Sequence, residues 1–87
     1  MGKILIIDDD LMMGDALTRL VNGMGHEAAY ASTIKDGLNR ILSEPFDIVF
    51  LDVMLPDGNG LDILPKIRET ISEPEVIIIT GSGDPDG

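Results

Sequence analysis

The chain has 87 residues, of which six are basic and sixteen acidic, with a formal net charge of −10 and no cysteine. This charge disfavours binding to nucleic acid or anionic membranes, and the lack of cysteine excludes disulfides and thiolate metal sites. The length predicts a single domain over residues 1–87. The first apolar run is four residues long, which is too short for a signal peptide or a membrane span, so we expect a soluble, cytoplasmic protein.

A buried strand and an amphipathic helix are predicted at the start of the chain. Residues 3–7 form a short apolar run, typical of a buried strand, that ends at the acidic triplet of residues 8–10. Apolar residues then recur at spacings of three and one, which predicts one face of a helix over residues 13–24. Asp10 is placed to cap this helix and Gly25 to end it.

A second strand and a second helix follow. Residues 26–31 predict the strand, with a weaker pattern than the first. Ser32 or Thr33 is placed to cap the helix, and Pro45 ends it. The predicted apolar face of this helix consists of Ile34, Leu38, Ile41 and Leu42.

The alternation continues through the second half of the chain. Residues 47–51 predict a third strand, and residues 76–79 are the strongest strand signal, ending at Thr80. Pro65 falls inside the helix pattern between them, so it must lie in the first turns of that helix or bend it. The predicted apolar face of this third helix consists of Leu61, Leu64, Ile67 and Ile71.

This alternation of strands and helices predicts an α/β fold. A strand–helix order of this kind is typical of a doubly wound, mostly parallel sheet with helices on both faces. The first, third and fourth strands are continuous apolar runs, so we expect them to be buried on both sides.

Polar side chains end the three strongest strands. Asp8 and Asp9 follow the first strand, Asp52 ends the third, and Thr80 ends the fourth. If these strands are neighbours, the polar groups meet at the carboxyl edge of the sheet, where such folds place their sites. Carboxylates without a nearby cation repel one another, and hard oxygen ligands suit Mg²⁺. The sequence therefore predicts a Mg²⁺ site into which the third strand directs Asp52.

Three segments, ILIIDDD, FDIVFLDVMLPDGNG and EVIIITGSG, resemble the receiver domain of two-component response regulators. The resemblance runs along the whole chain and implies a flavodoxin-like receiver fold with strand order 2-1-3-4. It also implies a function, in which Asp52 accepts a phosphoryl group from a histidine kinase and thereby switches partner interactions. Such a domain is not an enzyme beyond assisting its own phosphorylation and dephosphorylation. The sequence of residues 55–68 is similar to that of receivers attached to transcription activators.

The resemblance implies roles for individual residues. Besides the phosphoacceptor Asp52, which is also a metal ligand, Asp9 would bind Mg²⁺ directly and Asp8 through water. The backbone carbonyl of Met54 would be a further ligand. Thr80 would act as the switch hydroxyl that meets the phosphoryl oxygens, and the residue after it would let backbone N–H approach the phosphate. That residue is Gly81.

We also predict roles for residues of the loop that follows the phosphoacceptor. Asp57 is interpreted as a turn residue, because a calcium-binding loop counted from it would place Asp62 where glycine is needed and Arg68 where glutamate is needed. The residues that would shape this loop are Pro56, Gly58 and Gly60.

The chain departs from the receiver pattern at its end. Receivers have a fifth strand that ends in a lysine, whereas this chain stops after its predicted fourth strand and corresponds to the N-terminal two-thirds of a receiver. A second interpretation is therefore a phosphorylation-incompetent fragment that serves only as an interaction or dimerisation module, with no output domain of its own. We expect a homo-oligomer formed through residues 76–79, an apolar strand that would lie at the sheet edge. A phosphatase of the haloacid dehalogenase type is a weaker alternative, since Met12 stands where its motif has threonine or valine.

Overall fold

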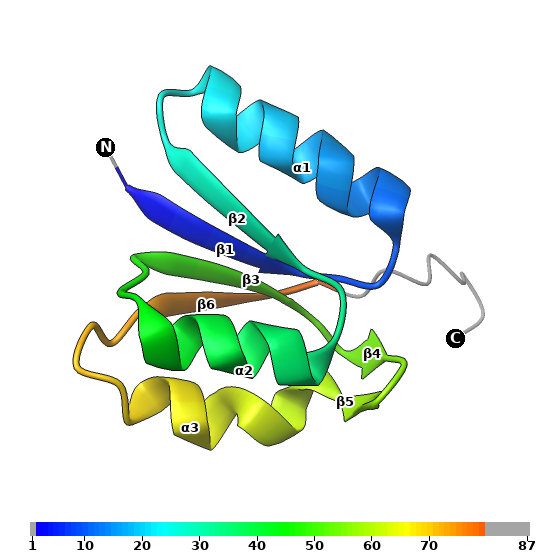
Figure 1. Cartoon of the computed structure of the whole chain (residues 1–87), viewed down its shortest axis with the longest axis vertical. Helices are drawn as coiled ribbons and strands as arrows, with labels where there is room; N and C mark the ends of the chain where they lie inside the picture. Colours follow the sequence, from blue (N-terminus) through cyan, green and yellow to red (C-terminus); the bar gives the residue numbers. More distant parts are fainter. Residues whose placement is uncertain (1, 80–87) are drawn as a thin grey trace.

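The computed structural model describes residues 2–79, which form a four-stranded parallel sheet, three helices and a small hairpin (Figure 1). The sheet has the order β2-β1-β3-β6, so the predicted α/β fold and the strand order 2-1-3-4 are confirmed, with β6 as the fourth strand. The strands of the sheet are β1 (Lys3–Ile7), β2 (Glu27–Ala31), β3 (Ile48–Asp52) and β6 (Glu75–Ile79). The helices are α1 (Leu11–Gly23), α2 (Ile34–Ser43) and α3 (Leu64–Arg68).

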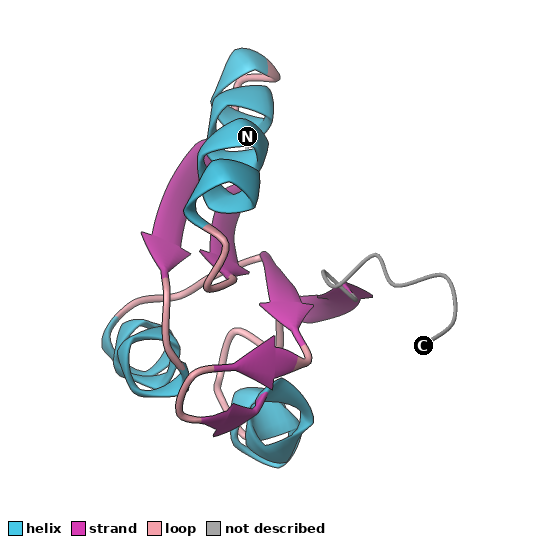
Figure 2. Cartoon of the chain, turned by 90° about the vertical axis from the view of Figure 1, so that its right-hand side faces the viewer, coloured by secondary structure: helices cyan, strands magenta, loops and turns pink. Residues whose placement is uncertain are grey.

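Helices cover both faces of the sheet. The helix α1 lies on one face, and α2 and α3 lie on the other, as Figure 1 and Figure 2 show from two directions. Successive residues of a strand point to opposite faces, and the β1 side chains accordingly divide between two apolar clusters. Leu5 and Ile7 pack in the cluster under α2 and α3, with Ile41 and Ile67, whereas Ile6 packs in the cluster under α1.

The helix caps follow the sequence prediction. The Asp10 side chain accepts hydrogen bonds from the backbone N–H of Met12 at 3.0 Å and of Met13 at 3.2 Å. Thr33, one of the two candidates, caps α2 by accepting a hydrogen bond from a backbone N–H at 3.0 Å. Gly25 follows α1 with a φ of +87°, a backbone conformation that glycine adopts without strain.

The predicted third helix is divided and shorter than its apolar pattern suggests. A 3-10 helix, η1 (Gly60–Ile63), precedes α3, and Pro65 lies in the first turn of α3 as expected. The prediction was wrong for Ile71, which is fully exposed beyond the helix end. The Thr70 hydroxyl donates a hydrogen bond to the Ile67 carbonyl at 2.6 Å, and side-chain bonds of this kind compete with continuation of a helix.

Several residues on the predicted apolar helix faces are also exposed. Leu20 on α1, Met24 directly after α1 and Leu42 on α2 are largely exposed to solvent. Among the described residues α1 is the one helix on its face of the sheet, so its flank has no helix neighbour. The prediction that the fourth strand is buried on both sides was wrong as well, because Ile77 is 43% exposed and Ile78 is 40% exposed. Its predicted place at the sheet edge is observed among the described strands.

A short hairpin follows β3 and was not predicted as strand. It consists of β4 (Met54–Leu55) and β5 (Gly58–Asn59), paired antiparallel around the predicted turn. Gly58 has a φ of +145°, a backbone conformation that residues with a side chain rarely adopt. In residues 2–79, no helix combines the length and the apolar content needed to cross a membrane.

Candidate metal centre

Three carboxylates meet at the carboxyl edge of the sheet. Because β1 and β3 pair in parallel, with Ile7 opposite Leu51, the residues that follow each strand lie side by side. Asp8, Asp9 and Asp52 each offer a carboxylate oxygen, and these oxygens all lie within 4.8 Å of one another. The convergence predicted for these three side chains is therefore observed.

Burial makes this cluster costly without a cation. Asp8 is fully buried and Asp52 is 4% exposed, whereas Asp9 is exposed. One Asp8 oxygen, Oδ1, accepts a hydrogen bond from the Asp10 backbone N–H at 2.9 Å. Within the part of the chain that the structure describes, the other, Oδ2, has no hydrogen-bond partner.

The electrostatic environment of Asp8, like its unpartnered oxygen, favours a bound cation. Burial raises the pKa of the Asp8 carboxyl, and the negative charges of Asp52 and Asp10 raise it further, although the N–H bond from Asp10 opposes them. An unpaired buried carboxylate oxygen is unfavourable, and a divalent cation would supply its missing partner. The donor set, all oxygen and partly open to solvent through Asp9, fits a Mg²⁺ ion.

The backbone around Asp8 is held from the neighbouring strand. The Asp8 N–H donates to the Ala31 carbonyl at 3.0 Å, and the Tyr30 hydroxyl donates to the Asp8 carbonyl at 2.5 Å. Burial raises the pKa of the Tyr30 hydroxyl, and the carboxylates of Asp8, Asp9 and Asp10 add to this effect. Tyr30 was not predicted from the sequence, because no local pattern connects a tyrosine in β2 with the end of β1.

The segment after β3 is packed closely against the phosphoacceptor candidate. The Met54 N–H lies 3.4 Å from Asp52 Oδ1, a long hydrogen bond. A Cβ atom at position 60 would lie 2.0 Å from the Asp52 carbonyl oxygen, so only glycine fits there. Gly60 therefore lies directly against the Asp52 backbone, while Pro56 is exposed at the turn of the hairpin.

Asp57 has a structural role that its place in a turn did not predict. Its Oδ1 accepts a hydrogen bond from the Ile34 N–H at 2.8 Å, and its Oδ2 accepts one from the Lys35 N–H at 3.1 Å. The carboxylate therefore caps the first turn of α2 from the hairpin, across 23 residues of sequence. These backbone hydrogen bonds, the bond from Ile34 first, lower the pKa of Asp57.

The roles implied for Thr80 and Gly81 fall on residues outside the described range. The last described residue of β6, Ile79, is paired with Asp52 in the register of the sheet. The fourth strand therefore reaches the same edge as the three carboxylates.

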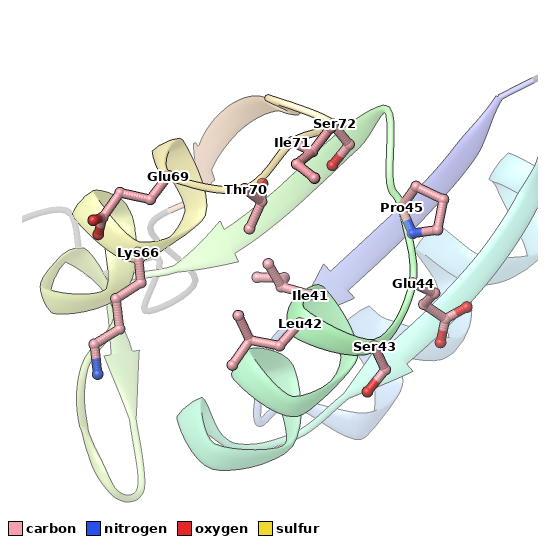
Figure 3. Close-up of a pocket in the computed structure, with 10 residues that line it drawn as sticks. All are labelled: Ile41, Leu42, Ser43, Glu44, Pro45, Lys66, Glu69, Thr70, Ile71 and Ser72. Carbon is pink, nitrogen blue, oxygen red and sulfur yellow. The ribbon is translucent and has the colours of Figure 1, made fainter.

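A pocket of about 620 Å³ lies away from the carboxylates (Figure 3). It is lined by residues 41–45, at the end of α2, and by Lys66 and residues 69–72, at the end of α3 and beyond. Both segments precede a strand of the sheet, so the pocket lies at the amino end of the strands. Ile41, Leu42 and Ile71 give it an apolar wall, and it shares no residue with the acidic cluster.

A parallel sheet of this order, with buried carboxylates at the ends of its first and third strands, defines a receiver-type α/β protein. Residues 4–87 match the model of the family described as response regulator receiver domain, and the chain belongs to this family. The resemblance predicted from the three sequence segments is thus confirmed.

Solved structures agree with this assignment. The receiver domain of a CheY-like response regulator from Methanospirillum hungatei JF-1 matches 99% of this chain and 69% of its own, with 30% identity and a TM-score of 0.88. The MaeR response regulator bound to beryllium trifluoride matches 97% of this chain and 70% of its own, with 32% identity and a TM-score of 0.82.

The similar curated proteins are regulators of greater length. Transcriptional regulatory protein LytR of Staphylococcus aureus is 39% identical over 80 residues, which are 90% of this chain and 32% of LytR. Swarming motility regulation protein RssB of Serratia marcescens is 38% identical over 78 residues, which are 90% of this chain and 36% of RssB. The chain thus spans about a third of the length of these relatives.

Proposed function

We propose that this chain is the phosphoacceptor domain of a two-component response regulator and that Asp52 accepts a phosphoryl group from a histidine kinase. Asp8, Asp9, Asp52 and the Met54 backbone carbonyl would hold Mg²⁺. The observation that carries the proposal is the buried Asp8 oxygen without a hydrogen-bond partner among residues 2–79, within reach of two further carboxylates. Family membership gives the chemistry its context.

The proposed step is a phosphoryl transfer to Asp52. A carboxylate oxygen of Asp52 attacks phosphorus, the bond from phosphorus to the kinase histidine nitrogen breaks, and that nitrogen leaves with the electron pair. Transfers of this kind depend mainly on alignment and on neutralisation of charge. Strand β3 supplies the alignment, because Asp52 ends a strand paired on both sides. When bound, Mg²⁺ would supply much of the neutralisation. Thr80 and Gly81 would contact the transferred group.

The partners follow from the same proposal. We infer a histidine kinase as phosphodonor and an output domain that regulates transcription, as the names of similar proteins suggest. The net charge of −10 argues against direct contact of this domain with nucleic acid. A cytoplasmic location suits a domain that receives its phosphoryl group from a kinase and passes the signal to transcription.

We also propose that two copies associate through β6. Within the described residues β6 pairs on one side only, with β3, so its other edge presents backbone groups to solvent. Ile77 and Ile78 add apolar surface on the two faces of this edge. A second copy related by a two-fold axis could pair with it and cover both side chains.

The test of the metal and phosphoacceptor roles compares the chain with two variants. Titration with Mg²⁺, followed by amide NMR, should perturb residues 8–10 and 52–54. Asp52→Asn should abolish this response and also the gain of one phosphoryl group from a small phosphodonor, detected by mass spectrometry.

Glu69→Gln is the matched control, since it removes one negative charge from an exposed site at the end of α3. It should leave both measurements unchanged. Unperturbed amides at residues 8–10 and 52–54 in the folded chain would refute the metal site. Phosphorylation that persists in Asp52→Asn would refute the assigned phosphoacceptor.

A further inference from the structure

Tyr30 connects the second strand to the backbone of the candidate metal centre. Its hydroxyl donates a hydrogen bond of 2.5 Å to the carbonyl oxygen of Asp8, 22 residues away in sequence. This carbonyl belongs to the peptide group that joins Asp8 to Asp9, two of the three clustered carboxylates. The hydrogen bond therefore constrains the peptide group that sets the orientation of both side chains.

The same peptide segment is held at two more points. The Asp8 N–H is bonded to the Ala31 carbonyl at 3.0 Å, and the Asp10 N–H is bonded to Asp8 Oδ1 at 2.9 Å. Of these three bonds, the one from Tyr30 is made by a side chain of another strand. It can therefore be removed by substitution without changing the backbone pairing of β1 and β2.

Gly14 makes room for the tyrosine ring. A Cβ atom at position 14 would lie 2.2 Å from Cε1 of Tyr30, far inside van der Waals contact. Gly14 is a buried residue within α1, where glycine is intrinsically unfavourable. A helix former at this position would displace the ring, so Gly14 and Tyr30 act as a complementary pair.

We propose that Tyr30 is a positioning residue for the metal centre, with Gly14 as the residue that admits its ring. The hydroxyl holds the Asp8–Asp9 peptide so that both carboxylates face Asp52, and the site is thereby arranged before the cation binds. Residues that orient metal ligands without touching the metal commonly affect metal affinity. This inference rests on the proposed function, since it assumes that the cluster binds Mg²⁺.

Tyr30→Phe tests the inference, because it removes the hydroxyl and keeps the ring. Isothermal titration calorimetry with MgCl₂ should give a dissociation constant about 3- to 10-fold higher than that of the unmodified chain, as expected for loss of one orienting hydrogen bond. Thr70→Val is the control, since the Thr70 hydroxyl bonds the Ile67 carbonyl at 2.6 Å, at the other end of the sheet. It should leave the dissociation constant unchanged.

A measurement without metal separates positioning from general stability. In EDTA, hydrogen exchange of the Asp10 amide should be faster in Tyr30→Phe than in Thr70→Val, even where chemical unfolding gives the two variants equal free energies. Gly14→Ala provides a second variant, which displaces the ring but keeps the hydroxyl. It should also weaken Mg²⁺ binding.

The outcomes distinguish this inference from the proposed function. If the unmodified chain binds Mg²⁺ and both Tyr30→Phe and Gly14→Ala bind it equally well, the positioning role is refuted and the metal site stands. If the unmodified chain binds no Mg²⁺, the proposed metal site and this inference fall together.

Discussion

Asp57 joins the loop after the phosphoacceptor to the first turn of α2. It does so with hydrogen bonds from two backbone N–H groups, those of Ile34 and Lys35, which a helix leaves without partners of its own. Its charge also lies at the positive end of the α2 dipole. The loop that carries Asp57 therefore depends on ionisation of a residue that is not part of the acidic cluster.

Replacement of Asp57 by asparagine should change the pH dependence of stability. The hydrogen bonds lower the folded pKa of Asp57, so its stabilising contribution is complete above the unfolded pKa, about 3.9, and is lost as the pH falls through the folded value. In urea unfolding, Asp57→Asn should be less stable than the unmodified chain at pH 7. The difference should shrink once the pH falls below about 4.

Asp62→Asn is the control for this measurement. It removes the same charge from an exposed residue of η1, close in sequence. Its effect on stability should be smaller at pH 7. A difference between Asp57→Asn and the unmodified chain that stays constant from pH 7 to pH 3 would contradict a capping role that depends on charge.

The third helix shows how two residues of one apparent apolar face are separated in the fold. Ile67 is fully buried in the cluster under α2 and α3, whereas Ile71 lies beyond the end of α3 and is fully exposed. The spacing of four between them predicts one helix face only if the helix continues. It ends at Arg68, so the pattern extends further than the element.

The same conservative change at these two positions should therefore have different effects. Ile67→Val removes one buried methylene and should lower the free energy of unfolding by about 0.5–1.5 kcal/mol. Ile71→Val should change it by less than about 0.5 kcal/mol, as expected for an exposed position. Chemical denaturation of both variants measures this. Equal losses at the two positions would show that Ile71 is buried in solution.

At the scale of the whole molecule, net charge and exposed apolar surface have opposite effects on self-association. Each chain carries a net charge of −10, which disfavours contact between copies. The outer edge of β6, with Ile77 and Ile78, favours such contact. Salt weakens the first effect by screening and leaves the second largely intact.

We therefore expect self-association that increases with salt. Light scattering should show a larger apparent mass at high than at low ionic strength. Ile77→Lys should reduce it, because it places a charge at the proposed contact, whereas Leu42→Lys, at an exposed position on α2, should not. A folded monomer of 9.4 kDa at every salt concentration, from micromolar to millimolar protein, would refute association through β6.

Local features of the sequence by themselves determined the order of the main elements, the helix caps and the acidic residues of the candidate site. The apolar runs and helical spacings predicted the order of the main elements. Asp10 was recognisable as a cap, and Thr33 as one of two candidates with Ser32, because a cap acts within three residues. Asp8, Asp9 and Asp52 could be placed together because parallel strands end at a common edge.

Tertiary structure decided the features that depend on contacts between distant residues. The bond from Tyr30 to Asp8 and the cap from Asp57 to α2 join positions more than 20 residues apart, and neither has a local signature. Burial was decided in the same way, since Leu42 has the spacing of a core residue and is exposed. Local periodicity reports which side chains could share a face, whereas burial requires an opposing surface, and only the packed fold determines where one exists.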